Sequence, residues 1–375
     1  MINFPYGKQT ITQDDIDSVV ESLKSELITT GPKTKKFEEA ICNYTGAKYA
    51  VAVSSATAAL HLISMILLKK DDLVLTTPNS FLATSNAIMY AGAKPLFVDI
   101  CENGNIDLDL CEEELKKNPA IKAIYAVSFS GNMLNQKRLE ELKERYNIVI
   151  LEDNSHTLGA SNDNIIAGSC KYSDCSVFSF HPVKNMTTGE GGMLTTNSEE
   201  IYKKMILLRN HGIEKKSQIA PWYYEMNEMG YNYRITDFQC ALGLTQLKKL
   251  DDFISKRREI ARYYENSFKN SLVQPLYPFE EGSAYHLFVV RINFRKLKIS
   301  KKELFDKLFH KMIGVQLHYI PINKQPFYRQ LGYGNENTPV MDKYYEEVLS
   351  LPIYPLLTKS EQNYIIKSLL ECINV

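Results

Sequence analysis

The chain has 375 residues, of which 44% are hydrophobic and 23% are charged, so it suits a globular protein of about two domains. Lysine plus arginine and aspartate plus glutamate both number 44, and no long basic run is present, which argues against nucleic acid or an anionic membrane as the main partner. The longest apolar run, at 58–68, is too short to span a bilayer, and the first residues lack a signal-peptide pattern. We therefore expect a cytoplasmic protein.

The stretch 47–197 alternates short apolar runs with amphipathic segments, among them 112–118 and 136–147. This alternation is typical of βαβ units around a mostly parallel sheet. We therefore predict an α/β fold, with a large domain over residues 1–245. The predicted strands are 48–53, 72–77, 94–100, 121–129, 147–153, 175–180 and 191–196.

The remainder of the chain predicts a second, smaller domain. Residues 234–269 contain no proline and read as one or two long helices that connect the domains. The tail that follows mixes strand-like runs, at 286–294 and 314–322, with helix-like ones. We expect a C-terminal α+β domain over residues 246–375. A further helix is predicted at 13–27, but the sequence does not place it.

A strand-to-helix turn at 54–57 is the first candidate functional stretch. It contains Ser54, Ser55, Ala56 and Thr57 between a strand and a helix-like run. Small residues and hydroxyl groups at such a turn let an anion approach the backbone N–H groups at the positive end of a helix. Ordinary N-capping explains the same residues equally well. This stretch alone leaves both interpretations open.

Asp153 is the second candidate, because it directly follows the apolar strand 148–152. In α/β sheets, ligands bind at the carboxyl ends of the strands. A carboxylate there can pair with a protonated ring nitrogen, and His156 is near enough in sequence to touch the same ligand. A helix cap at Asp153 is the alternative.

Lys184 is the third candidate, between the strand 175–180 and the glycine-containing stretch 187–192. Desolvation disfavours the charged form of a lysine, and the resulting free amine can form a Schiff base with a carbonyl. An ordinary surface lysine on a loop is the alternative. Taken together, a phosphate cradle, a carboxylate and an amine at strand ends of one sheet match what pyridoxal phosphate needs.

The order of motifs along the whole chain resembles the DegT/DnrJ/EryC1 family of sugar aminotransferases. The similar stretches are TTG at 29–31, SSATAAL at 54–60, TTPNSFLATSNA at 76–87, EDNSHTLGA at 152–160, FSFHPVKNMTTGEGG at 178–192, LRNHGI at 208–213, GYNYRITDFQCALGLTQLKKLD at 230–251, VQLHYIPI at 315–322 and SLPIYP at 350–355. The resemblance implies the fold type I of pyridoxal-phosphate-dependent transferases, which is that of aspartate aminotransferase.

Within the family, NGNID at 103–107, FSFHPVK and GYNYRITD are most similar to the branch that acts in pseudaminic acid biosynthesis. That branch aminates C4 of a UDP-linked 2-acetamido-2,6-dideoxy-hex-4-ulose with L-glutamate as donor. Asn185 stands where the family pattern leads us to expect proline. An aminotransferase for another UDP-, GDP- or dTDP-linked 4-keto sugar is the alternative.

The resemblance also implies roles for individual residues. Lys184 would carry the cofactor and move the proton, and Asp153 would pair with the pyridine nitrogen. Phe81 would stack on the ring, and His156 would lie near the phenolic oxygen. The implied phosphate ligands are Ala56, Thr57 and Ser179; the implied residues from the partner of a homodimer with shared active sites are Asn232 and Arg234; the candidates for the sugar nucleotide are Thr30, Gly31, His211, His318 and Tyr319.

Several of these residues have ordinary structural alternatives. His318 follows an alternating, strand-like run and could be a structural hydrogen-bonding residue, and Phe81 could belong to the core. Asn232 and Arg234 could form a solvated turn before a helix capped by Thr236 or Asp237. A pyridoxal-phosphate-binding regulator without catalysis is the alternative function, although no helix-turn-helix module or basic patch accompanies the motifs. No metal site is predicted.

Overall fold

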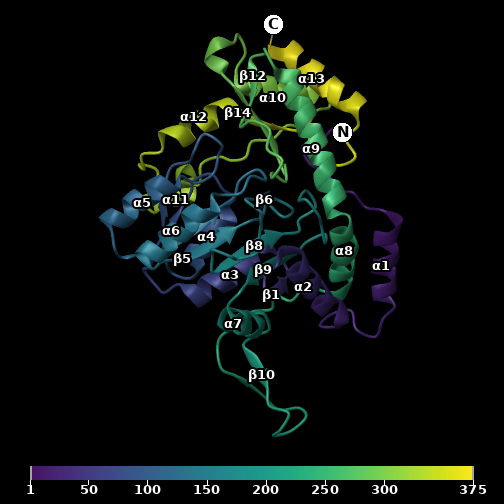
Figure 1. Ribbon diagram of the computed structural model, residues 1–375, viewed down its shortest axis with the longest axis vertical. Coiled ribbons are helices and arrows are strands. Elements are labelled where there is room, and N and C mark those ends of the chain that lie inside the picture. The colour runs from purple at the N-terminus through teal and green to yellow at the C-terminus, as the bar shows by residue number, and fades with distance from the viewer. Residues whose placement is uncertain (1, 374–375) are drawn as a thin grey trace.

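A central sheet of seven strands dominates the molecule, and the computed structural model describes residues 2–373 (Figure 1). Across the sheet the strands are β1 (Tyr49–Val53), β9 (Gly192–Thr196), β8 (Cys175–Ser179), β5 (Val149–Asp153), β4 (Ile121–Val127), β2 (Leu73–Thr76) and β3 (Lys94–Phe97). The strands from β8 to β3 are parallel, and β9 is antiparallel to both of its neighbours. The seven predicted strands and the mostly parallel sheet are confirmed.

Helices cover both faces of this sheet. Successive residues of a buried strand point to opposite faces, so apolar side chains on each face need helices to pack against. Val51 and Val53 of β1 pack in one core with residues of α3 and α7, while Ala50 and Ala52 pack in another core with residues of α2. The helices of this part are α2 (Pro32–Thr45), α3 (Ala56–Leu67), α4 (Leu82–Tyr90), α5 (Leu108–Lys117), α6 (Gln136–Tyr146) and α7 (Glu199–Arg209).

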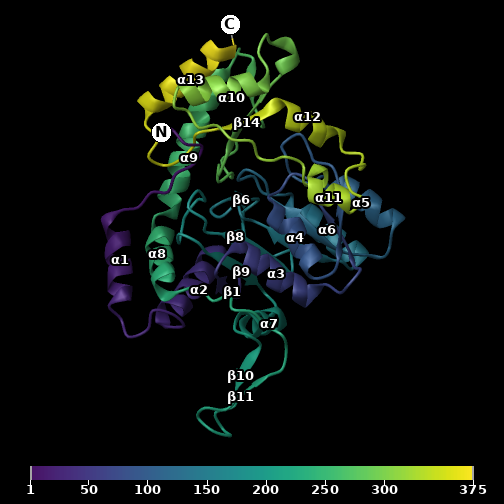
Figure 2. The same ribbon diagram turned by 180° about the vertical axis from the view of Figure 1, so that it is seen from behind.

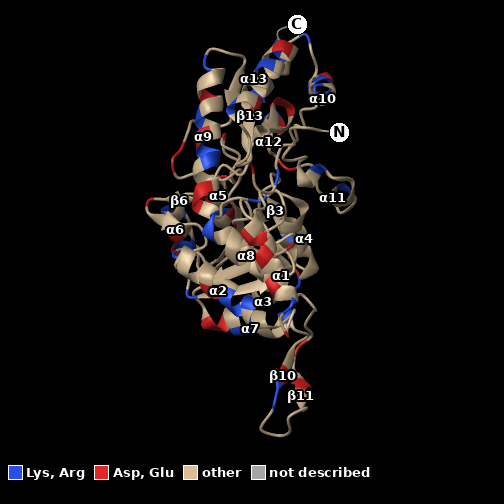
Figure 3. Ribbon diagram, turned by 90° about the vertical axis from the view of Figure 1, so that its right-hand side faces the viewer, with Lys and Arg blue, Asp and Glu red and all other residues tan. Residues whose placement is uncertain are grey.

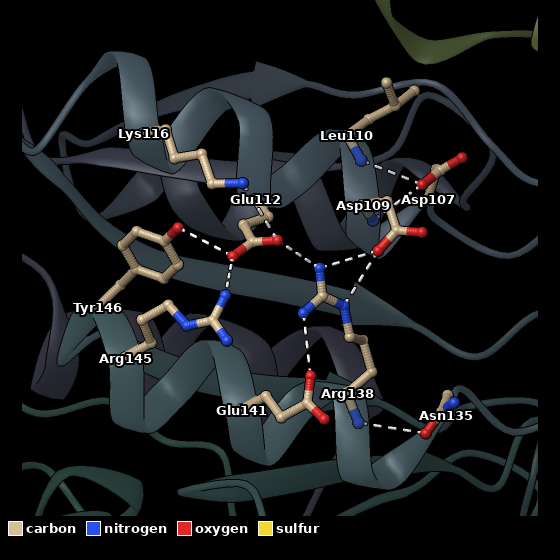
Figure 4. Close-up of polar contacts among 10 residues, drawn as sticks. All are labelled: Asp107, Asp109, Leu110, Glu112, Lys116, Asn135, Arg138, Glu141, Arg145 and Tyr146. Carbon is tan, nitrogen blue, oxygen red and sulfur yellow. Dashed lines mark hydrogen bonds and ion pairs between the residues drawn. The ribbon is translucent and has the colours of Figure 1, made fainter.

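A network of charged side chains fastens α5 to α6, the two helices predicted at 112–118 and 136–147 (Figure 4). Glu112 of α5 pairs with Arg138 at 2.6 Å and with Arg145, both from α6, and accepts a hydrogen bond from the Tyr146 hydroxyl. The hydrogen bond from Arg138 is the largest cause that lowers the pKa of Glu112, to about 2. Glu112 therefore stays ionised over the whole physiological pH range.

The C-terminal part has its own small antiparallel sheet and its own apolar core (Figure 1). Its strands are β12 (Val273–Pro275), β13 (Phe288–Ile292) and β14 (Val348–Leu351), and its helices are α10 (Lys301–His310), α11 (Pro326–Gln330), α12 (Pro339–Glu347) and α13 (Lys359–Ile373), with 3₁₀ turns at Phe294–Lys296 and Ile322–Lys324. The strand predicted at 314–322 is not present. Only Gln316 forms a β-bridge, with Ser350.

Two consecutive helices, α8 (Asp237–Lys248) and α9 (Leu250–Phe268), connect the parts, as predicted for 234–269. The N-terminal helix α1 (Gln13–Leu23) packs along α8, where the Ser18 hydroxyl donates to the Ala241 carbonyl. The proposed domain boundary at 245/246 falls within α8, and Phe4 forms a bridge with Ile313 of the C-terminal part. That boundary stays a prediction.

Two short hairpins extend from the large sheet. β6 (Ser161–Asn162) pairs with β7 (Ile165–Ile166), and β10 (Ile213–Lys215) pairs with β11 (Tyr224–Met226). The β10–β11 hairpin projects away from the body of the molecule beyond α7 (Figure 2). In the view of Figure 3, lysines and arginines are interspersed with acidic residues over the elements. Within residues 2–373, no helix combines the length and apolarity needed to cross a membrane.

Candidate active site

A cavity of about 560 Å³ opens at the carboxyl ends of the parallel strands. This is where open α/β sheets place their ligands. It brings together nine of the residues to which the resemblance assigns a role, along with Ser55 of the turn at 54–57 and further residues from the C-terminal part. The predicted residues that line it are Ala56, Thr57, Phe81, Asp153, His156, Ser179, Lys184, His318 and Tyr319.

One wall of the cavity is the N-terminus of α3. Ser55 caps this helix, because its side chain accepts a hydrogen bond from the Ala58 backbone amide. The backbone amides of Ala56 and Thr57 lie in the first helical turn and have no intrahelical acceptor. Gly192 of β9 allows the close packing here, since a Cβ on it would lie 2.4 Å from the carbonyl carbon of Ser55. The capping and anion-binding interpretations therefore coexist in one turn.

Asp153 ends β5 as a buried carboxylate. It is not the cap of a helix. One of its oxygens accepts a hydrogen bond from the Thr84 hydroxyl at 2.6 Å, and the other accepts from the Ser155 hydroxyl at 2.6 Å and the Ser155 amide at 3.1 Å. These three donors fix the orientation of the carboxylate at the edge of the cavity.

Lys184 lies in the turn region after β8 and lines the same cavity. Burial of its amino group lowers its pKa to about 8, and the negative charge of Asp153 opposes this shift. A substantial share of the Lys184 side chains is therefore neutral near physiological pH. A neutral amine is what nucleophilic attack on an aldehyde or general-base catalysis requires.

Three buried histidines surround Lys184: His156, His286 and His318. Burial, followed by the positive charge of Lys184, lowers the pKa of each of them, in the case of His318 to about 3. The histidines are therefore neutral at physiological pH. Within residues 2–373, Lys184 is the one lysine or arginine that lines the cavity.

The hydrogen bonds of His156 identify its tautomer. The Ser130 backbone amide donates to Nδ1 at 3.3 Å, so Nδ1 carries no proton. The proton of the neutral ring is therefore on Nε2, which lies 3.1 Å from the Tyr319 hydroxyl oxygen. This pair joins a residue of the large sheet to one of the C-terminal part.

The other predicted residues of the cavity differ in how they are held. One ring nitrogen of His318 pairs with the Ser350 hydroxyl at 2.8 Å, so His318 has the structural hydrogen bond considered from the sequence. Phe81 is 62% exposed, with its ring 6.3 Å from that of Tyr319. Phe81 is therefore not a core residue, and its ring is accessible to a flat ligand. Ser179 ends β8 at the same edge as Asp153.

Five predicted residues lie outside this cavity: Thr30, Gly31, His211, Asn232 and Arg234. They form a loop cluster beside the end of α7, where Asn210 and Asn232 form a β-bridge. The Arg234 guanidinium donates to the Asn210 side chain at 2.6 Å. Thr30 and Arg234 border another cavity, of about 590 Å³. Within one chain, these five residues do not meet the predicted residues that line the first cavity.

The loop cluster has a structural anchor in Asp237. This buried carboxylate accepts hydrogen bonds from the amides of Gly31 and Lys33, at 2.8 and 2.9 Å, at the start of α2. A Cβ at Gly31 would lie 2.5 Å from the Asp237 carboxylate, so Gly31 has a packing role. Thr236, rather than Asp237, caps α8, through a capping box with Gln239.

Thr84, Ser155 and His286 are residues of the cavity that the sequence did not single out. Thr84 stands within the similar stretch at 76–87, and Ser155 within the one at 152–160, so the motifs contained them without assigning a role. His286 opens the strand-like run at 286–294. It is far in sequence from His156, so no local pattern indicated that it lines the same cavity.

The residues of the cavity fit pyridoxal phosphate on the structure's own evidence. The free amides at α3 suit a phosphate, the fixed carboxylate of Asp153 suits a protonated ring nitrogen, and Lys184 supplies an amine. Two buried polar atoms of the cavity wall, Ser128 Oγ and His286 Nδ1, have no hydrogen-bond partner within residues 2–373. Polar groups of a ligand can satisfy atoms of this kind.

Comparisons with known proteins identify the family of the chain. The model of the DegT/DnrJ/EryC1/StrS aminotransferase family matches residues 9–370. The UDP-4-amino-4,6-dideoxy-N-acetyl-beta-L-altrosamine transaminase of Campylobacter jejuni is 41% identical over 363 residues, which are 96% of this chain and 95% of that protein.

Solved structures show the same fold. Helicobacter pylori PseC, an aminotransferase involved in the biosynthesis of pseudoaminic acid, has a TM-score of 0.93 at 33% identity, covering 99% of both chains. The pyridoxal-phosphate form of the putative sugar aminotransferase Spr1654 from Streptococcus pneumoniae has a TM-score of 0.90 at 31% identity, over 99% of this chain and 98% of that one. The predicted fold type I, family and cofactor class are confirmed, and the chain belongs to the DegT/DnrJ/EryC1/StrS aminotransferase family.

Proposed function

We propose that this protein transfers the amino group of L-glutamate to C4 of a nucleotide-linked 4-keto-6-deoxy sugar, with pyridoxal phosphate as cofactor. The sugar that we assign is UDP-2-acetamido-2,6-dideoxy-beta-L-arabino-hex-4-ulose, the substrate of the pseudaminic acid branch. The observation that carries the proposal is the cavity in which Lys184, Asp153 and the α3 N-terminus meet. The 41% identity with the Campylobacter jejuni transaminase supports the choice of sugar.

The residues that would hold the cofactor come from four segments. The amides of Ala56 and Thr57, with the Ser179 hydroxyl, would bind its phosphate. Asp153 would pair with its ring nitrogen, and Phe81 would cover its ring. When bound, pyridoxal phosphate supplies an aldehyde that accepts an amino group and a ring that withdraws electrons from the carbon that loses a proton.

Asp153 serves this chemistry because its carboxylate is held in place. Its three hydrogen-bond donors, from Thr84 and Ser155, keep the carboxylate oriented without a change of conformation during the reaction. A preoriented charge stabilises a developing charge better than a mobile one, because no reorganisation is needed.

Lys184 moves the proton. With a pKa of about 8, its amino group can accept the proton from the α-carbon of glutamate as a general base. In the second half-reaction the same group delivers a proton to C4 of the sugar. The neutral histidines around it add no positive charge that would depress its basicity further.

We also propose that the active protein is a homodimer in which Asn232 and Arg234 of one chain reach the cavity of the other. The loop cluster lies outside its own cavity, yet its motifs are those of the family's shared site. Thr30, Gly31 and His211 would then lie near the sugar nucleotide bound by the partner. The cluster is exposed or half-buried, so it is accessible to a second chain.

We propose that the protein is located in the cytoplasm, which is a reducing compartment. All seven cysteines are free, which is the usual state of cysteines in that compartment.

The test is an absorption spectrum of the purified protein with pyridoxal phosphate, recorded before and after addition of L-glutamate. We expect the visible band of the bound cofactor to fall and 2-oxoglutarate to appear in equal amount. A panel of UDP-, GDP- and dTDP-linked 4-keto sugars, with and without the 2-acetamido group, then identifies the acceptor. Cofactor binding without release of 2-oxoglutarate with any sugar would contradict the proposal.

A further inference from the structure

A second, much smaller void borders Lys184. Its volume is about 10 Å³, which is room for about one water molecule. It lies between the N-terminal segment before α1, the turn that carries Lys184, and helix α9. The residues that line it are Lys8, Gln9, Thr10, Pro182, Lys184, Asn185, Met186, Thr187, Gln246, Phe253, Arg257 and Pro355.

Three of these residues carry a buried polar atom without a hydrogen-bond partner within residues 2–373. The atoms are Thr10 Oγ1, Asn185 Oδ1 and Arg257 Nε. The residues are 8%, 5% and 1% exposed, so bulk water does not compensate for the missing partners. Buried polar groups are almost always hydrogen-bonded, and three exceptions on residues that line one void point to a ligand there.

Each of the three residues is held in position by its other contacts. Arg257 Nη1 donates to the backbone carbonyls of Tyr285, His286 and Ile353, at 3.3, 3.3 and 3.0 Å. Asn185 Nδ2 donates to the Leu158 carbonyl at 2.8 Å, which identifies Oδ1 as its unused acceptor. The site is therefore preorganised.

The Thr10 corner of the void is held as well, because the Gln246 side chain donates to the Thr10 backbone carbonyl at 2.8 Å. Arg257 remains a donor, since burial lowers its pKa only to about 10, well above physiological pH.

The donor and acceptor types define the ligand. Arg257 Nε–H can only donate, and Asn185 Oδ1 can only accept. A halide accepts hydrogen bonds but cannot donate to the Asn185 oxygen. A metal cation or ammonium ion would meet the positive charge of Arg257. A water molecule both donates and accepts, is neutral, and fits the volume.

We propose that a single buried water molecule occupies this void, accepts a hydrogen bond from Arg257 Nε, donates to Asn185 Oδ1 and bonds to the Thr10 hydroxyl. It ties the N-terminal segment and helix α9 to Asn185, the neighbour of Lys184 in the chain. The water and its three anchors are thus a positioning device for the turn that carries the lysine. Asn185 provides the amide oxygen that such a bridge needs and that a proline would lack.

Crystallography of the protein without cofactor, at a resolution that resolves single waters and with sodium bromide in the crystals, tests the site directly. We expect a peak at hydrogen-bonding distance from Arg257 Nε and Asn185 Oδ1, without anomalous signal from bromide. A bromide signal would show that the void binds a halide and not water, and the absence of any peak would show that the void is empty. Either result overturns the proposal.

A matched pair of variants tests the positioning role, and this arm rests on the proposed function. Thr10→Val keeps the shape of the side chain and removes the hydroxyl, whereas Thr10→Ser keeps the hydroxyl. Loss of one hydrogen bond predicts a kcat about fivefold lower for Thr10→Val, with an unchanged KM for glutamate and near-normal values for Thr10→Ser. Equal kinetics of both variants would rule out the positioning role. Failure of the proposed function itself would leave the crystallographic result unaffected.

Discussion

The cavity and the loop cluster both contain residues from the stretches that resemble the family. The two groups differ in their burial and in their position relative to the sheet. In the cavity, Asp153 and His156 are buried and hydrogen-bonded, and they face Lys184 at the edge of one sheet. In the loop cluster, His211 and Asn232 are exposed, beside the end of α7. The sheet topology brings Asp153 and Lys184 together, because parallel strands end at a common edge, and the C-terminal part adds His318 and Tyr319.

The second group has no such scaffold within one chain. Its loops are fixed by Asp237 and Asn210, which hold Gly31 and Arg234 in defined positions without a ligand. A rigid, exposed group of functional residue types outside the cavity is what a shared site in a symmetric dimer requires. The difference between the regions thus separates the site that one chain builds from the residues that a second chain would use in the proposed homodimer.

Replacement of Lys184 has the largest expected effect, because it removes the reactive group of the first region. Lys184→Ala and Lys184→Arg should both lower turnover by at least about 10³-fold, since neither side chain supplies a neutral amine. Release of 2-oxoglutarate is the measurement. Lys122→Ala, at an exposed lysine of β4, is the control and should keep full activity. An active Lys184→Arg would show that only positive charge is needed.

Arg234→Ala tests the second region and should lower turnover by about 10²-fold, as expected for loss of a charged contact to a substrate or cofactor. The decisive measurement mixes this variant with Lys184→Ala under conditions that exchange subunits. If the sites are shared, half of the dimers become mixed, and each mixed dimer contains one intact site. Activity should recover to about a quarter of the wild-type value.

The absence of recovery, with subunit exchange verified by mass spectrometry, would place both residues in the site of the same chain. The comparison between the regions would then lose its basis. Mixing two Arg234→Ala preparations with different tags is the control and should restore nothing.

Thr84→Val should have an intermediate effect, because it removes one of the three hydrogen bonds that orient Asp153. A hydrogen bond to a charged group contributes about 1.5–3 kcal/mol, so kcat should fall by about tenfold or more while the protein stays folded. Thr84→Ser keeps the hydroxyl and should retain most of the activity. Equal rates for the two variants would mean that Ser155 alone holds the carboxylate.

The pH dependence of Lys184 gives the smallest effect and concerns the first region alone. Below a pKa of about 8 the amino group is protonated and unreactive, so its labelling by acetic anhydride should rise with pH through about 8. Peptide mass spectrometry can measure this, with exposed Lys122 as an internal reference. In Asp153→Asn the rise should occur at lower pH, because the carboxylate stabilises the protonated amine. A shift to higher pH would contradict this coupling.

Much of the fold could be predicted because its strands are buried on both faces. The run 148–151 is apolar, and the acidic Asp153 at the end of this strand already indicated a ligand position. The prediction failed at 314–322, where only Gln316 pairs with another strand and the following residues line the cavity. Alternation in sequence does not provide the neighbouring strand that a β-ladder needs.

By itself, the sequence determined the order of the elements, the family and the types of reactive side chain, since these follow from local patterns and motifs. Only the tertiary structure decided that Thr84 fixes Asp153, that His286 joins His156, and that α1 packs on α8. It also decided that the loop cluster lies away from the cavity of its own chain. These contacts join residues far apart in the chain, and they depend on how the helices and sheets pack, which no local pattern encodes.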